Sequence, residues 1–360
     1  MMKKRIIYIL LIMLLMFSCK HKKTWENAKI DNTISSYENY LEQFPDGMFA
    51  DSAKIFIDEL IWENTAFVFV SSRDDNDGNN IQNTDIFYQK VNATDAKNIV
   101  SQGNGNYHDP DLSPDGNKIL FIKNGDINII NTDGSELNKI TDTQDNDDPS
   151  WTPDGSGILF TSTRLSNVPK LFLMDLATKN IEEIHTNQEN IVNPVFSPDG
   201  EKIAFAAHND STGYNIYIIN NDGSDSKQIT DDLDLDYSPS WSPDGLQIVY
   251  SSYDMSDFTN PNQMLFVTES SESISVIPQD FSSLKHLNSY IKLISIEDLN
   301  QQILIESDKN GYDPCWSGDI NSIIFTSNMS GNDDIYIMDP DGANIRNLTN
   351  NKASDHAAKF

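Results

Sequence analysis

Short apolar runs separated by polar turns recur along most of the chain. Residues 239–252 read Pro-Ser-Trp-Ser-Pro-Asp-Gly-Leu-Gln-Ile-Val-Tyr-Ser-Ser, with β-branched and aromatic residues on both sides of Ser-Pro-Asp-Gly. Such runs are typical of strands. In the turn, Pro presets φ, Asp can bond the backbone ahead of it, and Gly accepts a positive φ. The pattern predicts a strand, a tight turn and a second strand.

This phrase is repeated. Further copies lie at residues 110–116, 149–155 and 194–200, with a weaker one at 314–320. A third strand and a short fourth strand follow each turn, as in Asn215–Asn220 and the segment that ends at Ile229-Thr230. Four strands in a repeat of about 40–45 residues are typical of propeller blades. The sequence therefore predicts an all-β fold.

These turn copies resemble the WD40-like PD40 repeat of the TolB-type β-propeller. The resemblance covers residues 64–360 and implies a six-bladed β-propeller, with blades that begin near residues 64, 107, 146, 191, 236 and 311. The fold hosts many functions, so the resemblance alone assigns no activity.

The first blade lacks its opening strand. Residues 66–100 supply strands two, three and four, whereas Asp355–Phe360 aligns with the inner strand Asp236–Trp241. We expect the C-terminal strand to complete the first blade and close the ring, which leaves no open edge at the centre.

Blade five is irregular because residues 254–289 interrupt it. Its second strand lies near Ile248–Tyr250, and Leu293–Ile305 supplies the third and fourth strands. Within the insertion, Met264–Val267 and Ile274–Ile277 are candidates for a hairpin. Long loops on a rigid scaffold often carry binding. The alternative is that the insertion has no binding role and reflects sequence divergence of an irregular repeat.

The first 19 residues predict an export signal. Met-Met-Lys-Lys-Arg is followed by an apolar run that is too short for a comfortable membrane span. Leu15–Cys19 resembles the lipobox of a bacterial lipoprotein, which implies cleavage before Cys19 and acylation of its thiol. An ordinary signal peptide is the alternative. A lipoprotein is anchored to a membrane without crossing it. By analogy with proteobacterial sorting, the absence of Asp after Cys19 implies the outer membrane, facing the periplasm.

Residues 20–63 differ from the rest of the chain. Lys20–Lys23 is expected to be a basic tether, and residues 24–62 place apolar side chains at helical spacing on both sides of Phe44-Pro-Asp-Gly47. This segment predicts a helical hairpin, and Ser36–Gly47 resembles part of a tetratricopeptide repeat. A single repeat cannot bury its own apolar face. The hairpin is therefore expected to serve as a structural cap or a docking site.

Acidic residues dominate the composition. The chain holds 55 Asp and Glu against 25 Lys and Arg, a formal net charge of −30. Such a surface repels nucleic acid and anionic headgroups. It suits cationic partners, divalent cations or solubility alone. Of the two cysteines, Cys315 falls at an inner-strand position and is expected to be a small core residue. No disulfide is predicted, because Cys19 belongs to the lipobox-like sequence.

Sequence patterns for common enzyme chemistry are missing. The chain has no Gly-x-Ser-x-Gly, His-Glu-x-x-His, Cys-x-x-Cys or Gly-Lys-Ser/Thr pattern. The acidic loop Asp74–Gly78 has Arg73 and Thr84 at the first and twelfth ligand places, which excludes an EF-hand. A looser calcium site there stays open. We therefore predict a protein that is not an enzyme and assign it no cofactor.

One set of polar residues occupies equivalent positions in the blades. The residues before the inner-strand prolines are Asp109, Asp148, Asn193, Ser238 and Asp313, with Ala357 in the last copy. One place earlier sit His108, Asp147, Val192, Tyr237, Tyr312 and His356, of which the two histidines occupy equivalent places on adjacent blades. Innermost strands line a propeller's central channel, so these residues are expected to ring one mouth. They could cap strand ends, bind a peptide or protein, or hold a catalytic metal.

The sequence favours a cell-envelope lipoprotein whose propeller is a scaffold for envelope proteins or peptides. The resemblance to TolB implies such partners, although the larger N-terminal α/β domain of TolB has no counterpart here. The alternative is a carbohydrate-active propeller, either a metal-assisted polysaccharide lyase or a glycan-binding protein.

Overall fold

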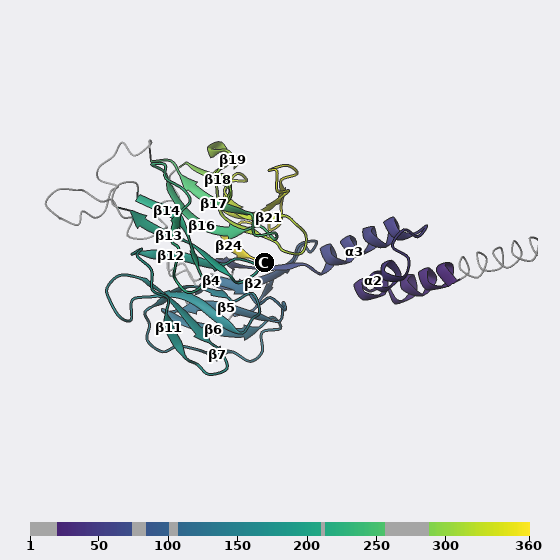
Figure 1. The fold of residues 1–360 in the computed structure, drawn as a ribbon, viewed down its shortest axis with the longest axis horizontal. Coiled ribbons are helices and arrows are strands. Elements are labelled where there is room, and N and C mark those ends of the chain that lie inside the picture. Colours follow the sequence, from purple (N-terminus) through teal and green to yellow (C-terminus); the bar gives the residue numbers. More distant parts are fainter. Residues whose placement is uncertain (1–19, 74–83, 101–106, 210–212, 256–287) are drawn as a thin grey trace, which may run out of the picture. The chain divides into compact units, whose positions relative to one another are not determined.

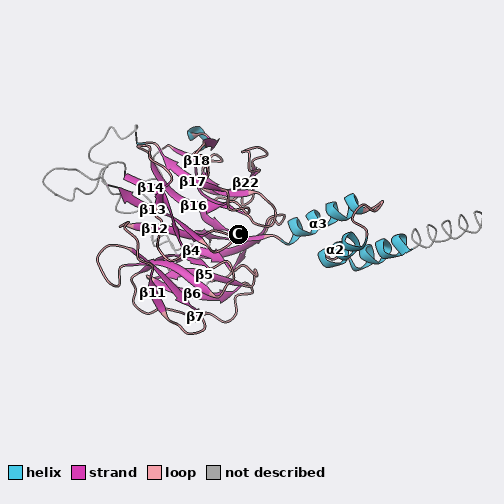
Figure 2. Ribbon diagram, in the orientation of Figure 1, coloured by secondary structure: helices cyan, strands magenta, loops and turns pink. Residues whose placement is uncertain are grey.

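The computed structural model describes residues 20–73, 84–100, 107–209, 213–255 and 288–360. It divides into two compact units, one that ends at Thr65 and one that spans Ala66–Phe360. Figure 2 shows that the α-helices belong to the first unit and the strands to the second. Within the described residues, no helix has both the length and the apolar character that crossing a membrane requires.

The N-terminal unit is helical. Residues 20–31 form a helix, which is followed by α2 (Ile34–Gln43) and α3 (Ala50–Asn64). Thr33 begins α2 with a capping box, in which its side chain and that of Ser36 each accept a hydrogen bond from the other residue's backbone N–H. The unit buries its own aromatic cluster, where Trp25 stacks on Phe49 and Phe56. Aromatic packing of this kind supplies the unit with its own small core.

The basic segment Lys20–Lys23, which the sequence predicts to be a tether, is helical. His21 is only 8% exposed, and its Nε2 lies 2.8 Å from Tyr40 Oη. His21 and Trp25 are four residues apart and therefore share one helix face. His21 therefore packs into the aromatic cluster of the unit.

The second unit contains six four-stranded sheets, which confirms the predicted six-bladed propeller. Blade one is β24 (Asp355–Lys359), β1 (Ala66–Ser71), β2 (Asp85–Lys90) and β3 (Lys97–Asn98). Blade two is β4 (Tyr107–Leu112), β5 (Lys118–Lys123), β6 (Asp126–Asn131) and β7 (Asn138–Lys139). Blade three is β8 (Asn146–Trp151), β9 (Gly157–Ser162), β10 (Lys170–Asp175) and β11 (Ile181–Glu183).

Blades four to six follow the same order from the inside outward. Blade four is β12 (Ile191–Phe196), β13 (Lys202–Asn209), β14 (Gly213–Asn220) and β15 (Lys227–Gln228). Blade five is β16 (Leu235–Trp241), β17 (Gln247–Tyr253), β18 (Ser289–Ser295) and β19 (Gln301–Ile305), and a short 3₁₀ helix, η3 (Ser307–Lys309), follows it. Blade six is β20 (Gly311–Trp316), β21 (Ile323–Ser327), β22 (Asp334–Met338) and β23 (Arg346–Asn347).

The ring closes as the sequence predicts. Strand β24 pairs antiparallel with β1, with His356 opposite Val70 and Asp355 opposite Ser71. Figure 1 shows the yellow β24 among the blue strands from the beginning of the propeller. Arg73 donates to Asp355 across this junction at 2.7 Å, and the Asp355 side chain is fully buried. Closure therefore joins the two ends of the propeller sequence in one sheet.

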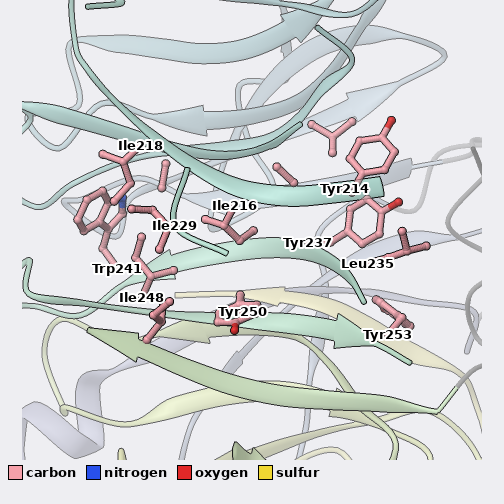
Figure 3. Packing of buried hydrophobic residues seen from close by; sticks show 14 of the residues in the cluster. Tyr214, Ile216, Ile218, Ile229, Leu235, Tyr237, Trp241, Ile248, Tyr250 and Tyr253 are labelled. Atoms are coloured by element: carbon pink, nitrogen blue, oxygen red, sulfur yellow. The ribbon is translucent and has the colours of Figure 1, made fainter. Parts of the chain in front are cut away.

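Large apolar side chains fill the space between blades. Figure 3 shows the cluster between blades four and five, with Tyr214, Tyr237 and Tyr253 at one end and Trp241 at the other. Burial of each such side chain stabilises the fold by about 1.5–3 kcal/mol. Trp241 also donates through Nε1 to the carbonyl of Val195 on the neighbouring blade at 3.3 Å. The tryptophan thus links consecutive inner strands.

Each inner strand contains a bulge at the residue before the proline position. The pairing register shifts there in all six blades. The six residues are left-handed, with φ of 49° at Asp109, 47° at Asp148, 50° at Asn193, 52° at Ser238, 48° at Asp313 and 52° at Ala357. Asp and Asn tolerate this conformation better than most residues, which accounts for their prevalence at this position.

The outer strands of blade five lie where the sequence predicts them, in β18 and β19. The candidate hairpin strands 264–267 and 274–277 lie outside the described residues, as do Cys19, the rest of the export signal and the acidic loop 74–78.

We expect Ala357→Gly to stabilise the protein. Ala at a φ of 52° carries strain that glycine relieves, and this gain exceeds the added flexibility of the unfolded chain. The free energy of unfolding, measured by denaturant titration, should rise by about 0.5–1 kcal/mol.

The neighbouring Ala358 is the matched control, because it is fully buried and has no positive φ. Ala358→Gly should lower the free energy of unfolding by about 0.5–1 kcal/mol. If both variants lose stability equally, the left-handed conformation assigned to Ala357 in β24 is contradicted.

Candidate functional site

A cavity of about 520 Å³ is lined by the inner strands of all six blades. We call it the channel, and three layers of equivalent residues form its wall. The mouth layer is Asp109, Asp148, Asn193, Ser238, Asp313 and Ala357. The middle layer is Asp111, Ser150, Val195, Ser240, Cys315 and Lys359. The apolar layer is Leu112, Trp151, Phe196, Trp241, Trp316 and Phe360.

Most polar residues of the mouth layer bond to one another around the ring. Asp148 accepts from the backbone N–H of Asn193 at 3.0 Å and from its side-chain amide at 2.7 Å. Asn193 Oδ1 accepts from the backbone N–H of Ser238 at 3.3 Å, and Ser238 Oγ donates to Asp313 at 2.9 Å. This belt links blades three, four, five and six. The left-handed bulges therefore fix the orientation of the carboxylates that line the channel.

A second polar group lies beside the mouth on blades two and three. His108 Nδ1 is 2.7 Å from Asp109 Oδ2 and 3.5 Å from Asp147 Oδ1. Burial opposes protonation of His108, but the hydrogen bond and charge of Asp109 outweigh it and raise the pKa of His108 to about 9. At neutral pH the imidazolium thus neutralises one carboxylate of the group.

Among the residues that the structure describes, His108, Asp109 and Asp147 form the group whose possible ligand atoms are close enough to share a metal ion. These atoms all lie within 4.8 Å of one another. His356 does not belong to that group, so the structure does not join the two histidines as ligands. The expectation that the residues one place before the mouth layer also ring the mouth is wrong for Val192, Tyr237 and Tyr312, which are buried. Successive strand residues point to opposite sides, so these side chains pack between blades.

The middle layer contains two charged residues that our sequence analysis did not select. Asp111 Oδ2 accepts from the backbone N–H of Trp151 at 2.8 Å, and Lys359 lies opposite Val68 in the closing strand pair. Residues two apart on a strand share a face, which was the available signal for both positions. Cys315 belongs to this layer and is a buried free thiol, as its inner-strand position suggested.

Enclosure in the channel changes the charge of its carboxyl groups. Burial raises the pKa of Asp111 to about 7, against the hydrogen bond from Trp151 and the charge of Lys359. Burial and the neighbouring charge of Asp109 likewise raise the pKa of Asp148 to about 7. Asp109 differs, because His108 lowers its pKa despite burial. The channel thus contains fixed negative charge and carboxyl groups that titrate near neutral pH.

Comparisons with known proteins agree with this architecture. A family model for the TolB β-propeller domain, PD40, matches residues 165–257. TolB from Acinetobacter baumannii is 15% identical with a TM-score of 0.63, over 87% of this chain and 72% of that chain. A putative TolB from Agrobacterium tumefaciens is 16% identical with a TM-score of 0.57, over 79% and 88%. The propeller is therefore TolB-like in fold.

The fold also resembles that of a nidogen/laminin complex, at 10% identity and a TM-score of 0.59, over 82% of this chain and 98% of that chain. No curated protein matches the chain. At these identities the likenesses establish the fold alone.

We expect Asp111→Asn to stabilise the protein at neutral pH. The folded pKa of Asp111 lies above its ordinary 3.8, so ionisation costs folding free energy as the pH rises from about 4 to 7. The full shift corresponds to roughly 4 kcal/mol, but channel water screens part of it. Denaturant titrations should show a gain of about 1 kcal/mol near pH 8 and a smaller gain near pH 4.5.

Asp154→Asn is the matched control. Hydrogen bonds from Ser156 and Thr152 lower the pKa of this exposed carboxyl to about 2, so its substitution should remove stability at neutral pH. An Asp111→Asn variant that shows the same loss would contradict the assigned pKa direction.

Proposed function

We propose that this TolB-like propeller is a protein-interaction scaffold that binds cationic peptide segments of a partner at its channel mouth. The observation that carries the proposal is the mouth layer, in which Asp109, Asp148 and Asp313 line one cavity. The belt of hydrogen bonds orients Asp148 and Asp313, and His108 orients Asp109. A preorganised site loses little conformational entropy on binding, which favours affinity.

The charge of the whole protein supports the same partner chemistry. A formal net charge of −30 attracts cationic groups over long range and speeds their association at low salt. The cavity volume lies within the range typical of sites for small ligands and short segments. An extended chain could satisfy its backbone through polar groups of the mouth and middle layers.

We place this scaffold in the cell envelope. The lipobox-like sequence that ends at Cys19 supports a lipid anchor, and by analogy with proteobacterial sorting the protein would face the periplasm from the outer membrane. Envelope proteins or peptides are then the proposed partners, and nucleic acid is excluded on charge.

The alternative, a metal-assisted polysaccharide lyase or a glycan-binding protein, has weaker support. The described group with metal-ligand spacing contains one histidine and two carboxylates, and one of the carboxylates is paired with that histidine. The anionic mouth would also repel an acidic polysaccharide. A divalent cation at His108 would compete with the proton that Asp109 stabilises there.

Neutralising the mouth should weaken partner capture. We expect Asp109→Asn with Asp313→Asn to lower partner recovery about tenfold, measured by crosslinking in native membranes and mass spectrometry. Loss of two charges from a partly enclosed site is worth about 1.4 kcal/mol, which corresponds to this factor. Asn tolerates the left-handed backbone, so the fold should survive.

Glu136→Gln with Glu201→Gln removes the same net charge from exposed sites outside the channel wall and serves as the control. It should leave recovery nearly unchanged at about 0.15 M salt, where the screening length is about 8 Å. Equal recovery with both double variants would place the partner elsewhere on the protein.

Loss of the proposed anchor should release the protein from membranes. We expect Cys19→Ser to move the protein from the membrane fraction to the soluble fraction, as measured by fractionation and immunoblotting. Lys20→Ser is the control and should stay with the membranes. Membrane retention of Cys19→Ser would show that acylation of this thiol is not what holds the protein there.

A further inference from the structure

Lys359 is a cation inside an otherwise acidic channel. It lies on β24, the strand that closes the ring, and its register opposite Val68 fixes its position in the middle layer. The side chain is only partly exposed. Within the described residues, no ion pair or hydrogen bond occupies its ammonium group. The ammonium group is therefore available to donate hydrogen bonds to an incoming anion.

The neighbours of Lys359 hold it in the charged form. Burial favours the neutral amine, but neighbouring acidic groups, Asp111 and Asp313 among them, outweigh it and raise the pKa of Lys359. Asp111, by contrast, titrates near neutrality and is engaged by the backbone of Trp151. The middle layer is thus less negative than the mouth layer, and its fixed charge is positive.

Two layers of opposite character therefore follow one another along the channel. Asp109 and Asp111 are two residues apart on β4, and the same interval separates Ala357 and Lys359 on β24. Two fully extended residues span about 6–7 Å, and the left-handed bulges at Asp109 and Ala357 make these intervals shorter than that. Residues i and i+2 of an extended peptide lie on the same side of it, so they are the pair that faces the two layers.

We propose that Lys359 makes the channel selective for an extended peptide with a basic residue at the mouth layer and an acidic residue two positions further in. This inference rests on the proposed function of the mouth and adds the order of charges in the partner. Asp109, Asp148 and Asp313 receive the basic side chain, and the ammonium of Lys359 receives the carboxylate.

The test uses three blocked peptides, Gly-Ser-Lys-Gly-Asp-Gly-Ser and its variants with Asn or Lys in place of Asp. Their dissociation constants for the full-length, detergent-solubilised protein are measured by calorimetry at about 50 mM salt. The wild type should bind the Asp peptide about tenfold more tightly than the Asn peptide and bind the Lys peptide most weakly.

Substitution of Lys359 should change this ranking. Lys359→Met keeps an unbranched chain of similar length and should bind the Asp and Asn peptides equally. Lys359→Glu should bind the Lys peptide most tightly. Lys352→Met removes an exposed lysine outside the channel wall and should keep the wild-type preference. Thermal melts establish that each variant is folded.

The outcomes separate the two proposals. If the wild type binds all three peptides with equal affinity, or if Lys359→Met keeps the preference for Asp, the role of Lys359 is overturned and the cationic-peptide scaffold stands. If the wild type binds none of the peptides, both proposals fail. The comparison of the three peptides on the wild type tests the predicted order of charges even if a variant does not fold.

Discussion

The antiparallel pairing of β24 with β1 is the contact on which the propeller depends. It joins residues nearly 300 positions apart and turns a row of repeats into a ring. An unclosed row would expose the edge of β1, which carries unpaired backbone groups and a fully buried apolar run. Closure also carries a large loop entropy, which the packing between blades must offset. The buried Arg73–Asp355 pair strengthens this junction and helps to set its register.

Closure creates the candidate site as well as the fold. The cavity exists only where six inner strands converge, and β24 contributes Ala357 to its mouth layer and Lys359 to its middle layer. The strand that completes the sheet therefore supplies the fixed positive charge of the channel. This five-residue segment therefore contributes both to the closing sheet and to the cavity wall.

The mouth layer has a structural role in the ring. Asp148, Asn193 and Ser238 hold neighbouring blades together, and their bonds run around the ring instead of into the channel. The belt agrees with the interpretation that these residues bond to the backbone, and it orients the carboxylates of Asp148 and Asp313. Enclosure moves the pKa of Asp148 to about 7, so the charge at the mouth depends on pH near neutrality.

The sequence by itself determined the repeat, the number of blades, the closing strand and the positions of the mouth layer. These features follow from the residues of the turns and from the periodicity of the strands, and both patterns recur in each repeat. Only the tertiary structure decided which strand face meets the channel, where Lys359 and Asp111 point, and that His108 pairs with Asp109 and Asp147. Each of these depends on bulges and on contacts between blades that are distant in the chain. The helical turn at His21 was missed for the same reason, since its partner Tyr40 lies 19 residues away.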